Sequence, residues 1–339
     1  MIKKIMLLMT SLTLLTCSVN AKSSDRPKWV DDPKSEYPDG IYLSVVGEGD
    51  SRRQAEQNAA AKLSRIFESK IEVEQSVQEK YTELTENNEA KTSSETNIAN
   101  QVNIASNQTL FNIKFDKYYT DKYGRVSVLA YIHRHNTAEI YESKIQDNIE
   151  KINFYEKQAV KADDLLKKFA YLDAAYIFHK NVQLLLEQMD IIQSSYKELL
   201  DINYDKSQLM NKYLSVSEKV TFSINVENDS NGKLYSIIEQ ALTDYGFSIV
   251  KTDPLIKVSS VVSLKKIKLP RKEKFIRWTL DIKIIKNRET FISIYEKGRE
   301  GHLNYSEAEA RAYRSMEDFV NGELEREINN HLKNMVMDN

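Results

Sequence analysis

The stretch from Thr137 to about Ser215 constrains the fold most, because its apolar residues recur at helical spacing over a long distance. Ala138, Tyr141 and Ile145 follow one another at steps of three and four residues. After a break near Lys168 the same spacing returns. We therefore expect two long antiparallel helices that separate an earlier part of the chain from a later one.

The part before these helices mixes strand and helix patterns. Residues 42–47 alternate as in a short strand, and Ser51 with Gln54 forms a capping box that begins a helix with an alanine-rich face. Residues 71–81 alternate well enough to predict another strand, and the polar stretch that follows predicts a loop. Further on, strands are expected on both sides of a turn at residues 121–124.

The part after the helices is mixed again. Alternation from Val220 predicts a strand, and Gly246 ends the helix that follows it. A terminal helix should begin at Ser306, with a capping box completed by Glu309. Further strands are predicted over residues 247–251, 256–264, 275–285 and 291–295.

These patterns predict an α+β fold, with two small α+β domains separated by a long antiparallel helical hairpin after an N-terminal export signal. The expected segments are a signal peptide (1–16), a lipidated N-terminus and tether (17–40), a first α+β domain (41–136), the helical hairpin (137–216) and a C-terminal α+β domain (217–339).

The first residues are typical of an export signal: two lysines, then an apolar run, then small residues where a peptidase could cut. Cleavage before Cys17 would make this cysteine a lipidated N-terminus, although Thr16 departs from the usual small residue. Cleavage after Ala21 would instead release a free periplasmic or secreted protein. We expect lipidation and a membrane anchor, with free protein as the alternative.

Cys17 is the only cysteine of the chain, so the sequence offers no disulfide and no thiolate metal site after the signal. The 48 basic residues nearly balance the 50 acidic ones, which gives a net charge of -2 and argues against nucleic acid as a partner. We expect no cofactor and no metal.

The loop between the first strand and its helix, "GEGDSRR", is the segment that most resembles a phosphate site. A phosphate cradle needs backbone N–H groups at a helix N-terminus without competing negative charge, whereas Glu48 and Asp50 lie inside this loop. Arg52 and Arg53 could offset them. A turn from strand to helix explains all these residues without a ligand, and contact with a ligand or partner is the alternative.

Histidines offer little chemistry. His133 and His135 would lie on one face of a strand and could supply two metal ligands, but no third ligand is evident, so surface histidines are the favoured interpretation. His179, His302 and His331 are isolated in the sequence and support no triad.

The segment "LKKIKLPRKEKFIR", residues 264–277, concentrates positive charge around Pro270. At a hairpin tip it could contact anionic lipid headgroups, other envelope polymers or an acidic partner, and a solvated tip that discourages edge pairing is the alternative. The candidate contact residues here are Lys265, Lys266, Lys268, Arg271 and Lys272.

The first domain resembles a known family in five short motifs that occur in the family's order: "PKWV", "VVGEGDS", "AEQNAAAKLSRIF", "KIEVEQSV" and "FDKYYTDKYGRVSVLAYIHR". Over roughly residues 27–150 the chain is similar to the Lpp-twenty family of bacterial envelope lipoproteins. The resemblance implies a small α+β domain in an envelope protein, with no catalytic residues to carry over. The family fold is similar to the N-terminal domain of the flagellar T-ring protein, which implies scaffolding or assembly.

Three functions follow as hypotheses. The first is a non-catalytic envelope lipoprotein that binds other envelope proteins or forms a homo-oligomer. The second is a soluble periplasmic protein that binds a small ligand in a cleft. The third is a hydrolase, which would need ionisable groups such as Glu48, Asp50 and His133 to converge.

Overall fold

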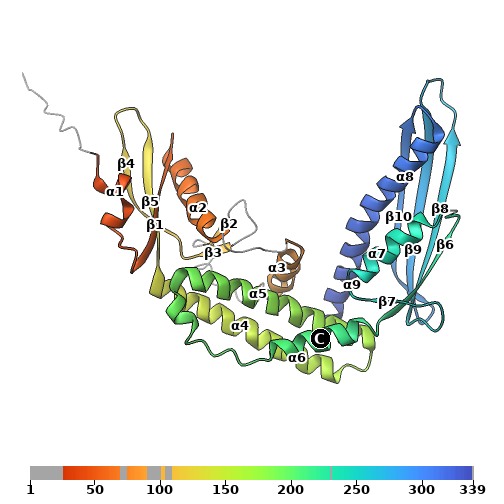
Figure 1. The fold of residues 1–339 in the computed structure, drawn as a ribbon, viewed down its shortest axis with the longest axis horizontal. Helices are drawn as coiled ribbons and strands as arrows, with labels where there is room; N and C mark the ends of the chain where they lie inside the picture. The colour runs from red at the N-terminus through yellow and green to blue at the C-terminus, as the bar shows by residue number, and fades with distance from the viewer. Residues whose placement is uncertain (1–25, 69–74, 90–100, 104–108, 230, 338–339) are drawn as a thin grey trace, which may run out of the picture.

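The structure is a computed structural model, and it describes residues 26–68, 75–89, 101–103, 109–229 and 231–337. Cys17, Ala21 and the export signal lie outside these residues, as does most of the predicted polar loop after residue 89. The described chain is mixed α+β, as the sequence predicts, and its two larger sheets rise from opposite ends of a layer of long helices (Figure 1).

A three-stranded antiparallel sheet, in the order β1-β5-β4, forms the core of the N-terminal part. Helix α2 packs on one face of this sheet, and the short α1 packs on the other face through Trp29 and Val30. A separate pair of short strands, β2 and β3, leads into β4. The elements are α1 (Lys28–Asp31), η1 (Pro33–Ser35), β1 (Tyr42–Gly49), α2 (Arg52–Glu68), α3 (Gln75–Glu89), β2 (Gln101–Asn103), β3 (Thr109–Phe111), β4 (Lys114–Thr120) and β5 (Val126–His133).

Three helices follow: α4 (Arg134–Lys161), α5 (Leu165–Lys197) and α6 (Lys206–Ser217). The break between the first two lies at residues 162–164 rather than near Lys168, because Asp164 caps α5 by accepting a hydrogen bond from the Lys167 N–H at 2.9 Å. The sequence reasoning did not separate α6, whose start is capped in the same way by Asp205.

The C-terminal part is built on a five-stranded sheet in the order β10-β9-β8-β6-β7. Strands β8, β9 and β10 pair antiparallel, whereas β6 runs parallel to both of its neighbours, with α7 in the connection. The elements are β6 (Thr221–Glu227), α7 (Lys233–Thr243), β7 (Ser248–Ile249), β8 (Ile256–Ile267), β9 (Lys274–Lys286), β10 (Glu289–His302), α8 (Tyr305–Phe319), η3 (Val320–Leu324) and α9 (Glu325–Met337).

Two local predictions are wrong. The segment that alternates from residue 71 contains helix α3 from Gln75, and this helix continues into the predicted polar loop. The helix predicted from Ser306 is α8, which is capped by Asn304: its side chain accepts from the Glu307 N–H at 2.7 Å, so the capping pair is not Ser306 and Glu309.

A single hydrophobic core connects the larger part of the molecule. Its buried residues extend from Ala59 in α2, through α4 and α5, to Val336 in α9. Phe169 of α5 shows this continuity, because its ring contacts both Tyr213 of α6 and Phe247 beside the five-stranded sheet, with ring centroids 5.6 and 4.9 Å apart. The two sheets are therefore connected through packed side chains rather than through exposed linkers.

Candidate functional site

The glycines between β1 and α2 are required by close packing. A Cβ atom on Gly47 would lie 2.2 Å from both the Ala55 carbonyl oxygen and the Ala59 backbone nitrogen. A Cβ atom on Gly49 would lie 2.8 Å from the Ala55 nitrogen. The strand can approach the helix backbone only without side chains at these positions, which accounts for the glycines without a phosphate.

Charged residues of the same turn are engaged with neighbours. Glu48 lies 3.7 Å from the Arg26 guanidinium and 3.3 Å from that of Arg125. Arg52 pairs with Glu56 on the next turn of α2 at 2.9 Å. These surface pairs make the turn electrically balanced rather than an attractive site for an anion.

Asp50 and Arg53 are exposed, and a partner contact through them stays a prediction. The Asp50 N–H donates to Gln54 at 2.8 Å, and the Ser51 hydroxyl accepts from the Gln54 N–H at 3.2 Å, so Ser51 caps α2 as predicted. His133 is far away: it is in register with Tyr42, six residues before Glu48 on β1, which is roughly 20 Å along a strand.

His133 and His135 do not share a strand face. His133 is the last residue of β5, and its Nδ1 accepts the Asn136 N–H at 3.4 Å as a cap for α4. His135 lies in the first turn of α4, 3.6 Å from Glu139. Within the described residues no group of three or more His, Cys, Asp or Glu side chains is arranged to hold a metal ion.

The basic segment is at a hairpin tip, where the sequence reasoning expects it. Lys265 and Lys266 lie just before the last residue of β8, and Lys268, Arg271 and Lys272 lie in the connection to β9. All five side chains belong to exposed residues.

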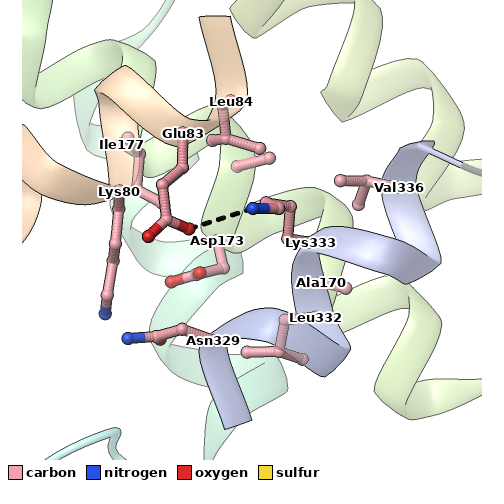
Figure 2. Close-up of a pocket in the computed structure, with 11 residues that line it drawn as sticks. Lys80, Glu83, Leu84, Ala170, Asp173, Ile177, Asn329, Leu332, Lys333 and Val336 are labelled. Carbon is pink, nitrogen blue, oxygen red and sulfur yellow. Dashed lines mark hydrogen bonds and ion pairs between the residues drawn. The ribbon is translucent and has the colours of Figure 1, made fainter. Parts of the chain in front are cut away.

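A small pocket lies where α3, α5 and α9 meet (Figure 2). We call it the helix-junction site and define it by five polar residues: Lys80, Glu83, Asp173, Asn329 and Lys333. Glu83 of α3 and Lys333 of α9 form an ion pair across it at 3.2 Å, which attaches α3 to the C-terminal helix.

Asp173 is the buried ionisable group of this site, with 7% of its surface exposed. Burial raises the pKa of its carboxyl group, because a charged carboxylate loses its hydration; the charge of Lys80 and a hydrogen bond from the Tyr213 hydroxyl oppose the rise. The Tyr213 pKa is raised mainly by its own burial and further by the negative charge of Asp173. Residues of α3 and α6 thus offset part of the free energy that the carboxylate loses when it is removed from water.

A second tyrosine completes the polar network beside the site. The Tyr245 hydroxyl lies 3.0 Å from the Glu325 carbonyl oxygen and 2.8 Å from Asn329 Oδ1. The Lys80 ammonium lies 5.0 Å from the centre of the Tyr245 ring and 4.0 Å from Glu325. Since these polar groups contact one another, the arrangement is suited to holding helices together.

A larger groove of about 650 Å³ lies between α3 on one side and α5 and α6 on the other. His179 in its wall is buried, and its Nδ1 lies 2.6 Å from the Tyr204 hydroxyl. Burial, together with the charges of Lys206 and Lys180, lowers the His179 pKa to about 4, so the ring is neutral at pH 7, and the tautomer of the ring determines which of the two groups donates. The volume lies within the range of small-ligand pockets.

Sequence reasoning missed both of these features. Asp173 and His179 lie on the predicted second helix, but each belongs to a run of mostly apolar residues in which a single polar residue gives no signal of a pocket. Lys80 lies in the segment misassigned as a strand. Each feature depends on α3, whose helical period is weak in the sequence because polar residues surround its few apolar ones.

Comparison with known families tests the family resemblance of the N-terminal part. Residues 27–133 match the LPP20 lipoprotein family. This match confirms the family resemblance for that region, and it ends at the last residue of β5, short of the residue 150 suggested by the motifs.

The LPP20 match covers both sides of the β1–α2 turn and the residues of α3, but not Asp173, Asn329 or Lys333. The helix-junction site is therefore formed jointly by the LPP20 region and by later parts of the chain. No curated protein matches the chain.

Three solved structures match this chain at low sequence identity. A secreted protein of Helicobacter pylori, HP1454, is 13% identical with a TM-score of 0.40, covering 81% of this chain and 96% of that one. A minor lipoprotein of Acinetobacter baumannii is 13% identical with a TM-score of 0.25, covering 34% and 90%. The rare lipoprotein B of Shewanella oneidensis is 11% identical with a TM-score of 0.25, covering 34% and 96%. At these scores we draw no functional conclusion from them.

None of the helices that the structure describes is both long and apolar enough to cross a bilayer.

Proposed function

We propose that this chain is a non-catalytic lipoprotein of the bacterial cell envelope, anchored through Cys17, that binds other envelope proteins and acts as a scaffold. The observation that carries the proposal is the LPP20 match over residues 27–133, which begins shortly after a cysteine that follows an apolar signal. The mature chain would present two α+β domains held apart by the hairpin of α4 and α5.

The continuous core supports a scaffold role. A protein that positions partners needs a fixed separation between its binding surfaces, and packed side chains resist bending better than a linker does. In the helix-junction site the ionisable groups contact one another, which favours structural roles for them over catalysis.

The test of anchoring is the intact mass of the N-terminal peptide from protein isolated from its native envelope. We expect a peptide that starts at Cys17 and carries acyl mass, together with loss of membrane association in a Cys17→Ala variant. A peptide that starts at Lys22 without lipid would refute the anchor.

Partner binding needs its own test. A photoreactive residue in place of Arg53, beside the predicted contact at Asp50, should give discrete crosslinked adducts in intact cells. The same residue in place of Val160, which is 76% exposed on α4, is the control. Equal labelling from both positions would argue against a specific surface at the β1–α2 turn.

The groove beside His179 supports a second candidate, a soluble periplasmic protein that binds a small ligand. A ligand that binds only the folded state raises the melting temperature. A compound that stabilises the natural chain, but not a variant with Tyr176→Ala in the groove wall, would favour this candidate over the scaffold.

A further inference from the structure

The end of the five-stranded sheet carries an unusual concentration of positive charge. We call this region the basic tip and define it by seven residues: Lys265, Lys266, Lys268, Arg271, Lys272, Lys274 and Arg277. All seven are exposed. No carboxylate of the described chain lies within 4.0 Å of any of these seven side-chain cations.

The pairing of the strands places some of these cations directly opposite one another. Lys265 of β8 is in register with Arg277 of β9, which is in register with Arg299 of β10. Register partners point to the same face of a sheet, about 5 Å apart, where like charges repel and destabilise the pair. Three cations in a row across three strands are a cost to folding that an external anion would relieve.

Apolar side chains lie at the same end of the sheet. Leu303, in the connection from β10 to α8, is 70% exposed. Lys274 is in register with His302, so this connection is beside the β8–β9 turn and its half-buried Leu269. Half-buried Phe275 lies 5.4 Å from the Arg299 guanidinium. Cations beside one exposed and two half-buried apolar side chains match a membrane interface, where headgroups meet hydrocarbon.

The position of the tip fits a planar partner. In Figure 1 the ends of β8, β9 and β10 that lie beside the start of α8 point away from the helical layer. The sheet of β1, β4 and β5, with α1 where the described chain begins, rises on the same side of that layer. A flat surface can therefore contact the basic tip on the same side of the helical layer as α1, near the start of the described chain.

We propose that the basic tip binds the surface of a bilayer that contains anionic lipids. This contact would add a second attachment point to the Cys17 anchor of the proposed function, but it does not depend on that anchor. Lipid headgroups can arrange themselves around a protruding hairpin, which is why we favour the bilayer.

The test uses the mature chain of a Cys17→Ala variant, which lacks an acyl group, and vesicles of phosphatidylcholine with or without phosphatidylglycerol. We expect binding only when the anionic lipid is present, and weaker binding as salt increases. A variant with Lys265→Gln, Lys268→Gln, Arg271→Gln and Lys272→Gln should bind at least about a hundredfold more weakly, since each cation near the surface contributes about fivefold.

A matched control removes four exposed lysines elsewhere, through Lys151→Gln, Lys157→Gln, Lys161→Gln and Lys219→Gln. It changes the net charge equally and should keep the affinity for the anionic vesicles. Equal loss in both variants, or no binding of the parent to the anionic vesicles, would overturn the proposal while leaving the Cys17 anchor untouched.

A final variant separates a bilayer from a soluble polyanion. Leu303→Ser should weaken vesicle binding severalfold without changing the binding of polyglutamate. If the chain binds polyglutamate as tightly as vesicles, and Leu303→Ser has no effect on either, then the bilayer is the wrong ligand and an acidic polypeptide is the right one.

Discussion

At the scale of single residues, Gly47 shows how a motif can resemble a ligand site for purely structural reasons. The sequence places glycines before a helix N-terminus, as a phosphate site does. Only the structure reveals that a Cβ atom at this position would lie 2.2 Å from backbone atoms of α2. Sequence reasoning could predict the turn and the Ser51 cap, because both are local, but it could not supply the distance to a helix backbone.

Substituting Gly47 tests this explanation. Gly47→Ala should lower the free energy of unfolding by about 3 kcal/mol, since the added methyl group overlaps backbone atoms that cannot move aside easily. Chemical denaturation would measure the change. Gly40→Ala is the control, because nothing lies within 4 Å of a Cβ atom there and its stability should be almost unchanged.

Asp173 gives a residue-scale prediction about pH. Its pKa is higher in the folded chain than in the unfolded one, so between these two values the folded state holds a proton that the unfolded state has lost. Stability should therefore fall as the pH rises through this window, and the full cost of ionisation should be present above it.

Replacing this carboxyl group should remove that dependence. In Asp173→Asn the amide oxygen can still accept a hydrogen bond from the Tyr213 hydroxyl, so we expect higher stability at pH 7 and a flatter stability profile at pH values above the ordinary pKa of an aspartate. Thermal unfolding across pH would measure both effects. An unchanged slope would mean that Asp173 does not titrate in this range, and exposed Asp163→Asn is the control.

At the scale of elements, α3 shows where sequence reasoning fails. Amphipathic periods predict α2, α5 and the strands of the larger sheet, because each has a clear buried face. The α3 segment has few apolar residues. Contacts with α5 and α9 stabilise this helix, and these contacts cannot be predicted from the sequence of the segment itself. Tyr81, for example, lies edge-on to Phe178 of α5 with ring centroids 5.4 Å apart.

Leu84 is the buried apolar anchor of this helix, with 4% of its surface exposed. Leu84→Ala should destabilise the docked state of α3 by about 2 to 3 kcal/mol. Hydrogen exchange should then be faster across α3 and around Asp173, with little change in β8 to β10. Thr82→Ala, at an exposed position of the same helix, should leave the exchange pattern unchanged.

At the scale of the whole molecule, the continuous core predicts coupled stability. Phe169→Ala removes a fully buried ring that contacts α6 and the residues beside the five-stranded sheet, so it should cost about 3 to 5 kcal/mol. Hydrogen exchange should increase in both α5 and β6. Exposed Phe154→Ala is the control, and a loss of protection confined to α5 would show that the sheet is independent of the helical layer.

The last helices show how one stretch of chain can serve two neighbours. Buried residues recur at every fourth position through α8, η3 and α9: Ala308, Ala312, Met316, Val320, Leu324, Ile328, Leu332 and Val336. In an α-helix each such step advances the buried stripe by about 40° around the axis. The wider π turn of η3 takes up part of this advance. The buried stripe therefore rotates gradually around the helix axis, so that it first faces strands β9 and β10 and then α5. This rotation determines which side chains of α9 face Asp173. The number of residues between the start of α8 and Asn329 therefore sets the orientation of Asn329 and Lys333 in the helix-junction site.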